Sequence, residues 1–409
     1  MNKHRLNLLY FTPEQWPTFR PDIVALFGKY LPRHGITIDL VTARNIDKQN
    51  NMILPWGGGK AILCNLPRNR VGKYFIKFLH NVKVLIFFNP QNYDVIQVRD
   101  MTMTALVAII MARLKGVQFF YWLSYPISEG YIERARAIGF KGGVRFWLPL
   151  MQGTFGVWLL YRVVLPRADH VFVQSHQMQI DLAKKGISML TMTPVPMGVD
   201  TEISSPESIT PSDDSRLKGK RVLVYLGTLD RVRQIEIIFQ MLAIIKHQVP
   251  NILLIVVGDS EDASHRDWLK REVKRMDIVD NVIWTGWLPS QQAWSYVRSA
   301  EIGLSPFPRG YLLDSASPTK MLEYMAFGLP VIVNDNPDQA QVIKDSGAGI
   351  CVKLEPFIFA ESVIRLLSDK SLCHKMGGDG RQYVTRIRAY DFLASSLAIK
   401  YHALYSGSH

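Results

Sequence analysis

Residues 221–234 read RVLVYLGTLDRVRQ, and the fold can be worked out from this stretch. Arg221–Leu226 is a short run of branched, aromatic and apolar residues, which is typical of a buried strand. Gly227 follows at once and permits a tight turn that approaches a ligand closely. A helical pattern begins near Ile235, so the stretch is predicted to form one strand–turn–helix unit.

Strand and helix patterns alternate on both sides of this unit. Alternation of this kind produces parallel sheets with right-handed crossovers. The sequence therefore predicts an α/β protein with two doubly wound parallel sheets. The predicted strands before the unit are Leu6–Phe11, Thr37–Thr42, Asp94–Val98, Val117–Trp122 and His170–Gln174, and those after it are Ile252–Val257, Val282–Trp284, Ile302–Ser305, Pro330–Val333 and Ile350–Val352.

A polar segment separates the two series. Residues 204–220 read SSPESITPSDDSRLKGK, a composition typical of a linker. We expect an N-terminal domain over 1–203, the linker over 204–220, a C-terminal domain over 221–388, and a last helix over 389–409 that crosses back to the first domain. Because parallel sheets bind ligands beyond the carboxyl ends of their strands, two such domains facing each other would enclose a cleft.

Composition excludes several classes of protein. The chain has 409 residues, of which 48% are hydrophobic and 20% charged, so it can build large cores and is not disordered. Cys64, Cys351 and Cys373 are its three cysteines, and no C-x2-C pair exists. A zinc ribbon and a disulfide framework are therefore not expected, and a reducing, cytoplasmic location is favoured.

The positive charge is concentrated in the first half of the chain. Residues 1–200 hold 24 Lys and Arg against 11 Asp and Glu, whereas residues 201–409 hold 24 of each kind. A basic half indicates an anionic partner, which is a nucleic acid, an acidic membrane surface or a phosphorylated substrate. A solvated basic face with no partner is the alternative.

Two turns in the second half favour phosphate binding. Gly227 ends one predicted strand and Gly258 ends the next. Arg231 and Arg233 follow the first turn, just before a helix whose free N–H groups and dipole attract anions. Together these features predict a diphosphate site, although a tight turn with solvated arginines would have the same sequence.

A third segment adds polar groups to this site. Residues 315–333 read SASPTKMLEYMAFGLPVIV, with Pro318 placed for the first turn of a helix and Ser317 placed to cap it. A lysine in the first turn, here Lys320, is unfavourable unless an anion docks there. Glu323 lies one turn further on and can accept two sugar hydroxyls, as a ribose would offer. A solvated helix residue is the alternative for Glu323.

These segments and three others resemble glycosyltransferase family 4. RADHVFVQS at 167–175, VPMGVD at 195–200 and VIWTGWL at 282–288 are similar to family motifs in the family's order. The resemblance covers roughly residues 90–405 and implies the GT-B fold, with two Rossmann-like domains and a donor cleft between them. It also implies a retaining transferase that uses a nucleotide sugar as substrate and no cofactor.

Carried over by position, the resemblance assigns roles to single residues. Glu323 would bind the ribose, Arg233 would take the place of the family's diphosphate-binding lysine, and Thr319 and Lys320 would lie near the diphosphate or the sugar. Gly286 and Leu288 would border the base.

The chain departs from the family pattern at several positions, two of which concern the predicted site residues most directly. Ser315, with Asp314 beside it, replaces the first glutamate of the family's Glu-x7-Glu motif, which normally addresses the donor sugar. Ser124, with Glu129 nearby, stands where the family has a histidine of the catalytic region. We therefore expect Ser124, Glu129, Arg233 and Lys320 as the catalytic set.

No Asp-x-Asp sequence occurs in the chain, which disfavours the metal-dependent fold of sugar transferases. In a metal-independent enzyme, cationic side chains and helix N-termini would stabilise the leaving diphosphate.

The apolar stretch from Phe146 to Leu165 approaches the length of a membrane span but contains Pro149 and Arg162. Within residues 134–167, basic residues bracket aromatic ones, as at an interface with anionic lipids. An ordinary buried helix is the alternative. No nucleic-acid-binding module is recognised, so we do not expect a nucleic-acid partner.

The sequence thus predicts a metal-independent hexosyltransferase, more consistent with UDP-sugars than with GDP-sugars. Its acceptor would be a lipid-linked or polysaccharide glycan at the cytoplasmic face of a membrane, to which the protein would bind peripherally. Two alternatives remain at this point, a non-catalytic GT-B binding or assembly protein and a sugar-nucleotide epimerase.

Overall fold

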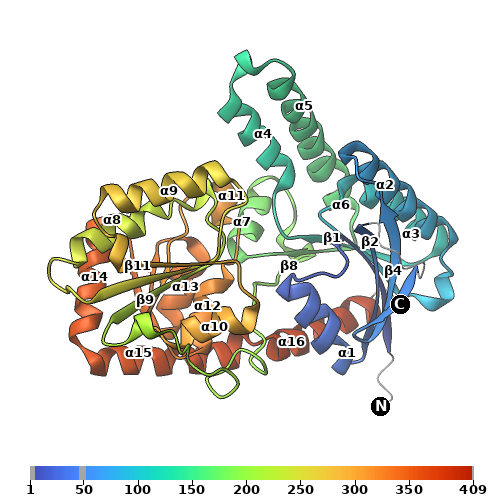
Figure 1. The fold of residues 1–409 in the computed structure, drawn as a ribbon. Coiled ribbons are helices and arrows are strands. Elements are labelled where there is room, and N and C mark those ends of the chain that lie inside the picture. The colour runs from blue at the N-terminus through green and yellow to red at the C-terminus, as the bar shows by residue number, and fades with distance from the viewer. Residues whose placement is uncertain (1–4, 46–51, 408–409) are drawn as a thin grey trace. The chain divides into compact units, whose positions relative to one another are not determined.

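The predicted alternation of strands and helices forms two parallel-sheet units in a computed structural model that describes residues 5–45 and 52–407 (Figure 1). One unit comprises Met1–Pro196 together with Tyr390–His409, and the other comprises Met197–Ala389. The expectation of two doubly wound parallel sheets is confirmed.

The sheet of the first unit has the strand order β3-β4-β2-β1-β5-β6-β7-β8 and is parallel except for the β3–β4 pair. The chain leaves β1 toward β2 and later returns to β5 on its other side, so the order switches between β1 and β5. The strands are β1 (Leu6–Gln15), β2 (Ile36–Asn45), β3 (Ile53–Trp56), β4 (Gly59–Leu66), β5 (Val95–Arg99), β6 (Gln118–Leu123), β7 (His170–Val173) and β8 (Met192–Pro194).

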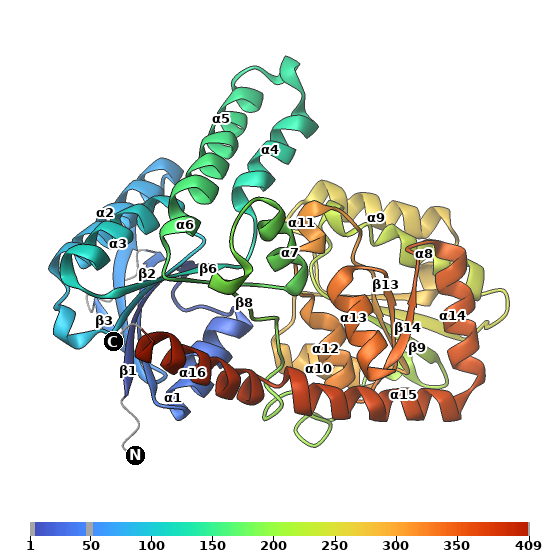
Figure 2. The same ribbon diagram turned by 180° about the vertical axis from the view of Figure 1, so that it is seen from behind.

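Both faces of this sheet are covered, which explains the continuous apolar runs in its strands. In β1, Leu8 and Tyr10 belong to one core and Leu9 and Phe11 to the other. The last helix, α16 (Tyr390–Ser406), lies beside α1 (Leu31–Arg33) in the first of these cores (Figure 2). The other helices are η1 (Asp22–Tyr30), α2 (Arg70–Phe87), η2 (Pro90–Asn92), α3 (Thr102–Lys115), α4 (Ile127–Ile138), η3 (Phe140–Gly142), α5 (Val144–Leu159), η4 (Leu160–Val164), α6 (Leu165–Arg167), α7 (His176–Lys184) and η5 (Met189–Thr191).

Helices α4 and α5 form a hairpin that projects from the first unit (Figures 1 and 2). Glycines allow the two helices to pack closely, because a Cβ on Gly153 would lie 2.7 Å from the Ser128 carbonyl oxygen and one on Gly156 would lie 2.5 Å from the Ser128 hydroxyl. The predicted apolar stretch is thus the second helix of this hairpin, which returns from the tip to the unit. The helix Val144–Arg167 is long and apolar enough to cross a membrane by length and composition, and 33% of its most apolar window is buried.

The second unit is a wholly parallel sheet of order β11-β10-β9-β12-β13-β14, so its switch lies between β9 and β12. Its strands are β9 (Arg221–Leu226), β10 (Ile252–Val257), β11 (Val282–Gly286), β12 (Ile302–Ser305), β13 (Val331–Asn334) and β14 (Gly349–Val352). Its helices are η6 (Ser215–Leu217), η7 (Arg231–Arg233), α8 (Glu236–Ile245), α9 (Ala263–Arg275), η8 (Val279–Asn281), α10 (Ser290–Arg298), α11 (Tyr311–Asp314), α12 (Thr319–Ala326), α13 (Pro337–Ser346), α14 (Pro356–Ser368), α15 (Lys370–Tyr383) and η9 (Val384–Arg388).

The unit boundary differs from the predicted one, because residues 197–220 lie within the second unit and not in a first domain or a linker. Ile209 is buried in that unit's core. The backbone N–H of Ser212 donates to the Ser299 hydroxyl at 2.8 Å, and Asp214 accepts from the Tyr296 hydroxyl at 3.1 Å. The Ser- and Asp-rich segment therefore forms turns that are hydrogen-bonded to α10 and to Ser299 at its end.

Both chain connections enter the second unit at one place. The Val199 N–H donates to the Arg388 carbonyl oxygen at 2.9 Å. The Arg388 guanidinium is buried and pairs with Asp338 at 2.6 Å, while the Ser317 hydroxyl donates to the same carboxylate at 2.7 Å. This buried cluster links the two connections to the start of α12.

Candidate functional site

The carboxyl ends of β9, β10 and β11 meet at closely packed glycines. Gly227 and Gly258 have φ values of +139° and +136°, which favour glycine over all other residues. A Cβ on Gly258 would lie 2.1 Å from the Gly227 carbonyl oxygen. Gly258 also pairs with Gly286 in an isolated antiparallel bridge, and Leu288 packs against the core behind it. The structure thus brings together the predicted strand-end glycines and the predicted base-side residues.

Lys320 reaches these strand ends from α12. Its side chain is buried, with Nζ 4.0 Å from the centre of the Tyr225 ring and 3.4 Å from where a Cβ on Gly227 would lie. Burial lowers the pKa of Lys320 well below its usual value, the nearby Arg233 lowers it further, and Glu323 acts in the opposite direction. Within residues 5–45 and 52–407, no carboxylate lies within ion-pair distance of this ammonium group.

Arg233 is the second cation at the site. Its guanidinium carbon lies 4.4 Å from the centre of the Phe307 ring, at the β12 side of the switch point. Its Nη1 atom is buried and has no hydrogen-bond partner in the described part of the chain. Two neighbouring cations that form no ion pair repel each other, and an anion placed between them would relieve the repulsion.

Glu323 lies on the same helix, one turn beyond Lys320. It is half-buried and accepts a hydrogen bond from Trp294 Nε1 at 3.0 Å. Burial raises the pKa of Glu323 to about 7, although Trp294 and Lys320 act to lower it. The carboxylate keeps acceptor capacity beyond this one hydrogen bond.

Other predicted donor residues are engaged elsewhere. Arg231 is exposed and pairs with Asp262 at 3.2 Å, on the N-terminal side of α9. Asp314 pairs with Arg309 at 2.8 Å, and the buried Ser315 hydroxyl donates to the Tyr311 carbonyl oxygen at 3.0 Å.

Two details at the start of α12 concern capping. Thr319, the first residue of the helix, is half-buried. The prediction that Ser317 caps this helix is wrong, because Pro318 takes the N-cap position with no side-chain bond and the Ser317 hydroxyl turns to Asp338.

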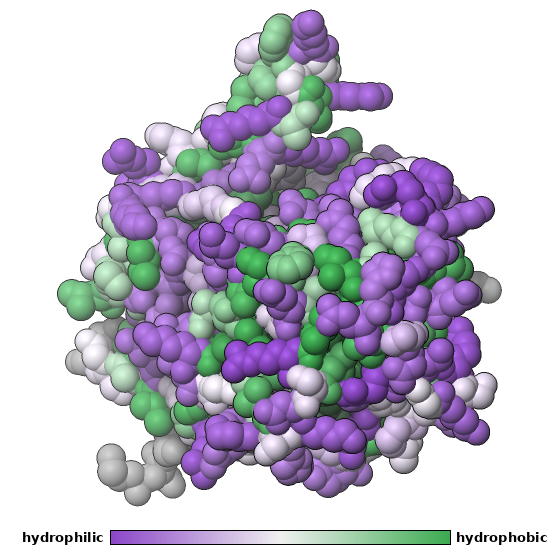
Figure 3. Space-filling model, turned by 90° about the vertical axis from the view of Figure 1, so that its left-hand side faces the viewer, coloured by the Kyte–Doolittle hydropathy of each residue, from purple (hydrophilic) through white to green (hydrophobic). Residues whose placement is uncertain are grey.

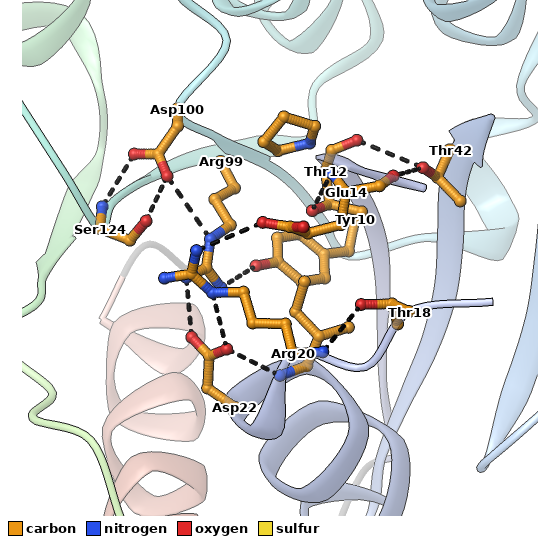
Figure 4. Close-up of polar contacts among 12 residues, drawn as sticks. Tyr10, Thr12, Glu14, Thr18, Arg20, Asp22, Thr42, Arg99, Asp100 and Ser124 are labelled. Atoms are coloured by element: carbon orange, nitrogen blue, oxygen red, sulfur yellow. Dashed lines mark hydrogen bonds and ion pairs between the residues drawn. The ribbon is translucent and has the colours of Figure 1, made fainter. Parts of the chain in front are cut away.

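The first unit contains a buried ionic cluster at its own switch point (Figure 4). Arg99 ends β5 and is fully buried, with Nη2 2.7 Å from Asp22 and Nη1 3.3 Å from the Tyr10 hydroxyl. Asp100 follows with a φ of +51° and accepts hydrogen bonds from both the backbone N–H and the hydroxyl of Ser124. The predicted residue Ser124 is therefore held at the carboxyl ends of β5 and β6.

One edge of this cluster reaches solvent. Arg20, which is about a third exposed, pairs with Glu14 at 3.2 Å and with Asp22 at 3.0 Å. Glu129, the other catalytic residue predicted in this unit, takes part in a different group, where it accepts from Lys185 at 2.8 Å and from the Tyr161 hydroxyl. Ser124 and Glu129 thus have separate sets of partners.

Several residues at these sites were missed by sequence reasoning. Three of them contact predicted residues: Trp294 contacts Glu323, Phe307 contacts Arg233, and Arg309 contacts Asp314. None of the three belongs to a recognised sequence motif, so there was no reason to select them from the sequence. Arg99 and Asp100 follow the predicted strand Asp94–Val98 directly, and their position at a strand's carboxyl end was the signal that could have identified them.

Two family models match the chain. "Glycosyl transferases group 1" matches residues 210–383, and "Glycosyl transferase 4-like domain" matches residues 23–198. Each model thus falls largely within one of the two units.

Curated relatives match over part of their length. A putative teichuronic acid biosynthesis glycosyltransferase of Bacillus subtilis is 27% identical over 182 residues, which is 44% of each chain. A GDP-mannose-dependent phosphatidylinositol monomannoside mannosyltransferase of Mycobacterium tuberculosis is 25% identical over 50% of this chain and 54% of its own. The chain spans about half the length of the curated relatives it matches.

A solved structure matches over almost the whole chain. The sucrose-phosphate synthase from Thermosynechococcus elongatus superposes with a TM-score of 0.73 at 17% identity, covering 98% of this chain and 100% of its own. The likeness confirms the GT-B fold.

Proposed function

The chain belongs to the group 1 glycosyl transferases, and we propose that it transfers a sugar from a nucleotide diphosphate donor to a lipid-linked or polysaccharide glycan at the cytoplasmic face of a membrane. The observation that carries the donor assignment is the pair of neighbouring cations, Lys320 and Arg233, at the switch point of the second sheet, neither of which forms an ion pair within the described residues. A diphosphate supplies the missing negative charge, and the strand-end glycines Gly227 and Gly258 let it approach the backbone.

In this proposal, each group of the second unit has a defined task. Lys320 and Arg233 hold the diphosphate and stabilise the charge that grows on it as the bond to the sugar breaks. Glu323, oriented by Trp294, accepts hydrogen bonds from the ribose hydroxyls. These cations would carry the electrostatic stabilisation without a metal ion, and the reaction would proceed with retention, as the family resemblance implies.

The position of the donor sugar is the least defined part of the proposal. Asp314 and Ser315 replace the family's sugar-binding glutamate, and Arg309 neutralises Asp314. We propose that the Arg309–Asp314 pair borders the sugar and helps to select it. The acceptor would bind to the first unit near Ser124 and Arg20, at the carboxyl ends of its strands.

The test is a nucleotide screen followed by turnover. We expect a UDP-sugar to raise the midpoint of thermal unfolding by mass action and to be hydrolysed slowly, with EDTA causing no loss. GDP-sugars must be included, because one relative is GDP-mannose-dependent. If no nucleotide sugar binds, the donor assignment is wrong; binding without turnover would favour a non-catalytic protein, and isomerisation of the free donor would favour an epimerase.

A further inference from the structure

The α4–α5 hairpin carries an apolar stripe that none of the described residues of the unit covers. Gly153 and Gly156 face α4, so the opposite side of α5 is left to solvent. Two of its tryptophans, Trp147 and Trp158, are 56% and 55% exposed. At the top of Figure 3, where the hairpin stands, hydrophobic and hydrophilic residues lie side by side. The other large hydrophobic residues exposed on the hairpin and its tip are Ile127, Ile138, Phe140, Val144, Leu148, Met151 and Phe155.

The same hairpin is strongly basic. Arg134 and Arg136 on α4, Lys141 at the tip and Arg145 on α5 are all exposed. Glu129 and Glu133 are the acidic residues between 127 and 167, and Glu129 is already paired with Lys185. Aromatic and basic side chains that share one exposed surface fit a bilayer with anionic headgroups.

Helix α2, which the sequence analysis did not detect, extends this surface. Its exposed residues include Val71, Tyr74 and Phe75, and no Asp or Glu occurs between Asp47 and Asp94. Tyr74 lies close to α4: burial raises the pKa of Tyr131, and the neighbouring Tyr74 raises it further. Helix α2 is therefore a neighbour of α4, the other helix of the hairpin that carries the stripe.

We propose that α2 and the α4–α5 hairpin together form a docking surface for an anionic lipid bilayer, with the hairpin tip inserted at the headgroup level. The hairpin does not span the bilayer, because the inner end of its helix is fixed in the protein core through Leu160, Val164 and Leu165. This proposal rests on the proposed function, since it would bring the transferase to a lipid-linked acceptor.

A second observation links the surface to the candidate acceptor site. Lys77, on the inner side of α2, is largely buried and donates to the Pro13 carbonyl oxygen at 2.6 Å, beside Glu14 in the cluster of Figure 4. Burial lowers its pKa to about 8. The helix proposed to contact lipid, α2, is thus hydrogen-bonded through Lys77 to the strand-end loop that would bind the acceptor.

The test uses flotation of the full chain with vesicles of phosphatidylcholine alone and of equimolar phosphatidylcholine and phosphatidylglycerol. We expect binding to the anionic vesicles that weakens as salt is added. Neutralising three cations, in Arg134→Gln/Lys141→Gln/Arg145→Gln, should lower the partition coefficient about a hundredfold, since each basic residue near such a surface contributes about fivefold. Lys270→Gln, on α9, is the matched control and should change nothing.

The apolar contribution is tested separately. Trp147→Ser/Phe155→Ser should lower binding about tenfold or more, and Tyr74→Ser/Phe75→Ser should also lower it if α2 is part of the surface. Phe357→Ser/Ile399→Ser removes equally exposed apolar residues elsewhere and serves as the control.

Three results would overturn the proposal: no flotation even at low salt, equal binding to neutral vesicles, or self-association through the hairpin, seen by sedimentation and abolished by Trp147→Ser/Phe155→Ser. Donor hydrolysis by the same samples separates the two claims. If the wild-type chain hydrolyses a nucleotide sugar but does not float with anionic vesicles, only the docking surface is rejected. If the wild-type chain floats but turns over no nucleotide sugar, the proposed function is rejected.

Discussion

Replacing Lys320 with methionine should weaken nucleotide binding without lowering the stability of the fold. Methionine keeps most of the length of the side chain and removes the charge that lies 4.0 Å from the Tyr225 ring centre. In the nucleotide-free protein, this ammonium group is buried, forms no ion pair in the part of the chain that the structure describes, and is repelled by Arg233; Glu323 and Asp230 offset these unfavourable effects only in part. The folded state should therefore lose an unfavourable interaction, and the free energy of unfolding should stay constant or rise by about 1–2 kcal/mol.

The same change should impair donor binding and turnover. A charge-assisted hydrogen bond to a phosphate contributes about 1.5–3 kcal/mol, so the Kd for the nucleotide diphosphate should rise roughly 10- to 150-fold. Loss of one group that stabilises the developing charge should lower kcat about 10²- to 10³-fold. Urea unfolding at fixed pH gives the stability, titration calorimetry with UDP and GDP gives the affinity, and the hydrolysis assay gives kcat.

Lys344→Met is the matched control, because Lys344 is exposed on α13, away from the strand ends. A pH series adds a second check. The pKa of Lys320 is lowered in the folded state, so wild-type stability should rise with pH between that lowered pKa and the ordinary value of 10.5, and this rise should vanish in the variant. The reasoning fails if Lys320→Met destabilises the protein by several kcal/mol while nucleotide affinity stays at the wild-type value.

Three further substitutions test other parts of the structure. Because burial raises the pKa of Glu323 to about 7, wild-type stability should fall as pH rises from about 4.5 to about 7, and Glu323→Gln should abolish that slope in urea titrations across this range and weaken nucleotide binding. Gly258→Ala places a Cβ 2.1 Å from a carbonyl oxygen and should cost at least about 2 kcal/mol, whereas Gly378→Ala, where a Cβ meets nothing within 4 Å, should be neutral or slightly stabilising in the same unfolding assay. Arg388→Met leaves the buried Asp338 carboxylate without its ion-pair partner and should cost about 3–5 kcal/mol in that assay; a change below about 1 kcal/mol would contradict the buried ion pair.

The parallel sheets were predictable because their signals are local. Each central strand is a short apolar run, buried on both faces, and glycines such as Gly116 and Gly347 end the helices between strands with a positive φ. Helix α2 lacks the usual signals at both of its ends. At its start, Asn69 makes no side-chain capping bond, and at its end the residue is Phe88 instead of a glycine. Its exposed face also carries apolar residues, so the alternation of apolar and polar faces that identifies a helix in the sequence is lost.

The gathering of the candidate donor residues at one sheet edge was predictable because its signals are local too. Gly227, Arg233, Lys320 and Glu323 lie next to strand ends or helix starts, where position along the chain fixes position in space. The partners of these residues were not predictable, because they come from distant segments. Trp294 reaches Glu323 from another helix, and Asp338 takes the Ser317 hydroxyl that the sequence alone would assign to a helix cap.

The side-by-side connections at Val199 and Arg388 also determine how the chain can mature during synthesis. Residues 197–389 form one uninterrupted segment, so the second unit can fold as soon as it emerges from the ribosome. The first unit begins earlier but must wait until α16 has been made, because Leu397 and Tyr401 of α16 complete its core and the Tyr401 hydroxyl donates to Gln97 at 2.5 Å. The first unit can therefore reach its final structure only after the whole of the second unit has been made, and it depends on an intact α16.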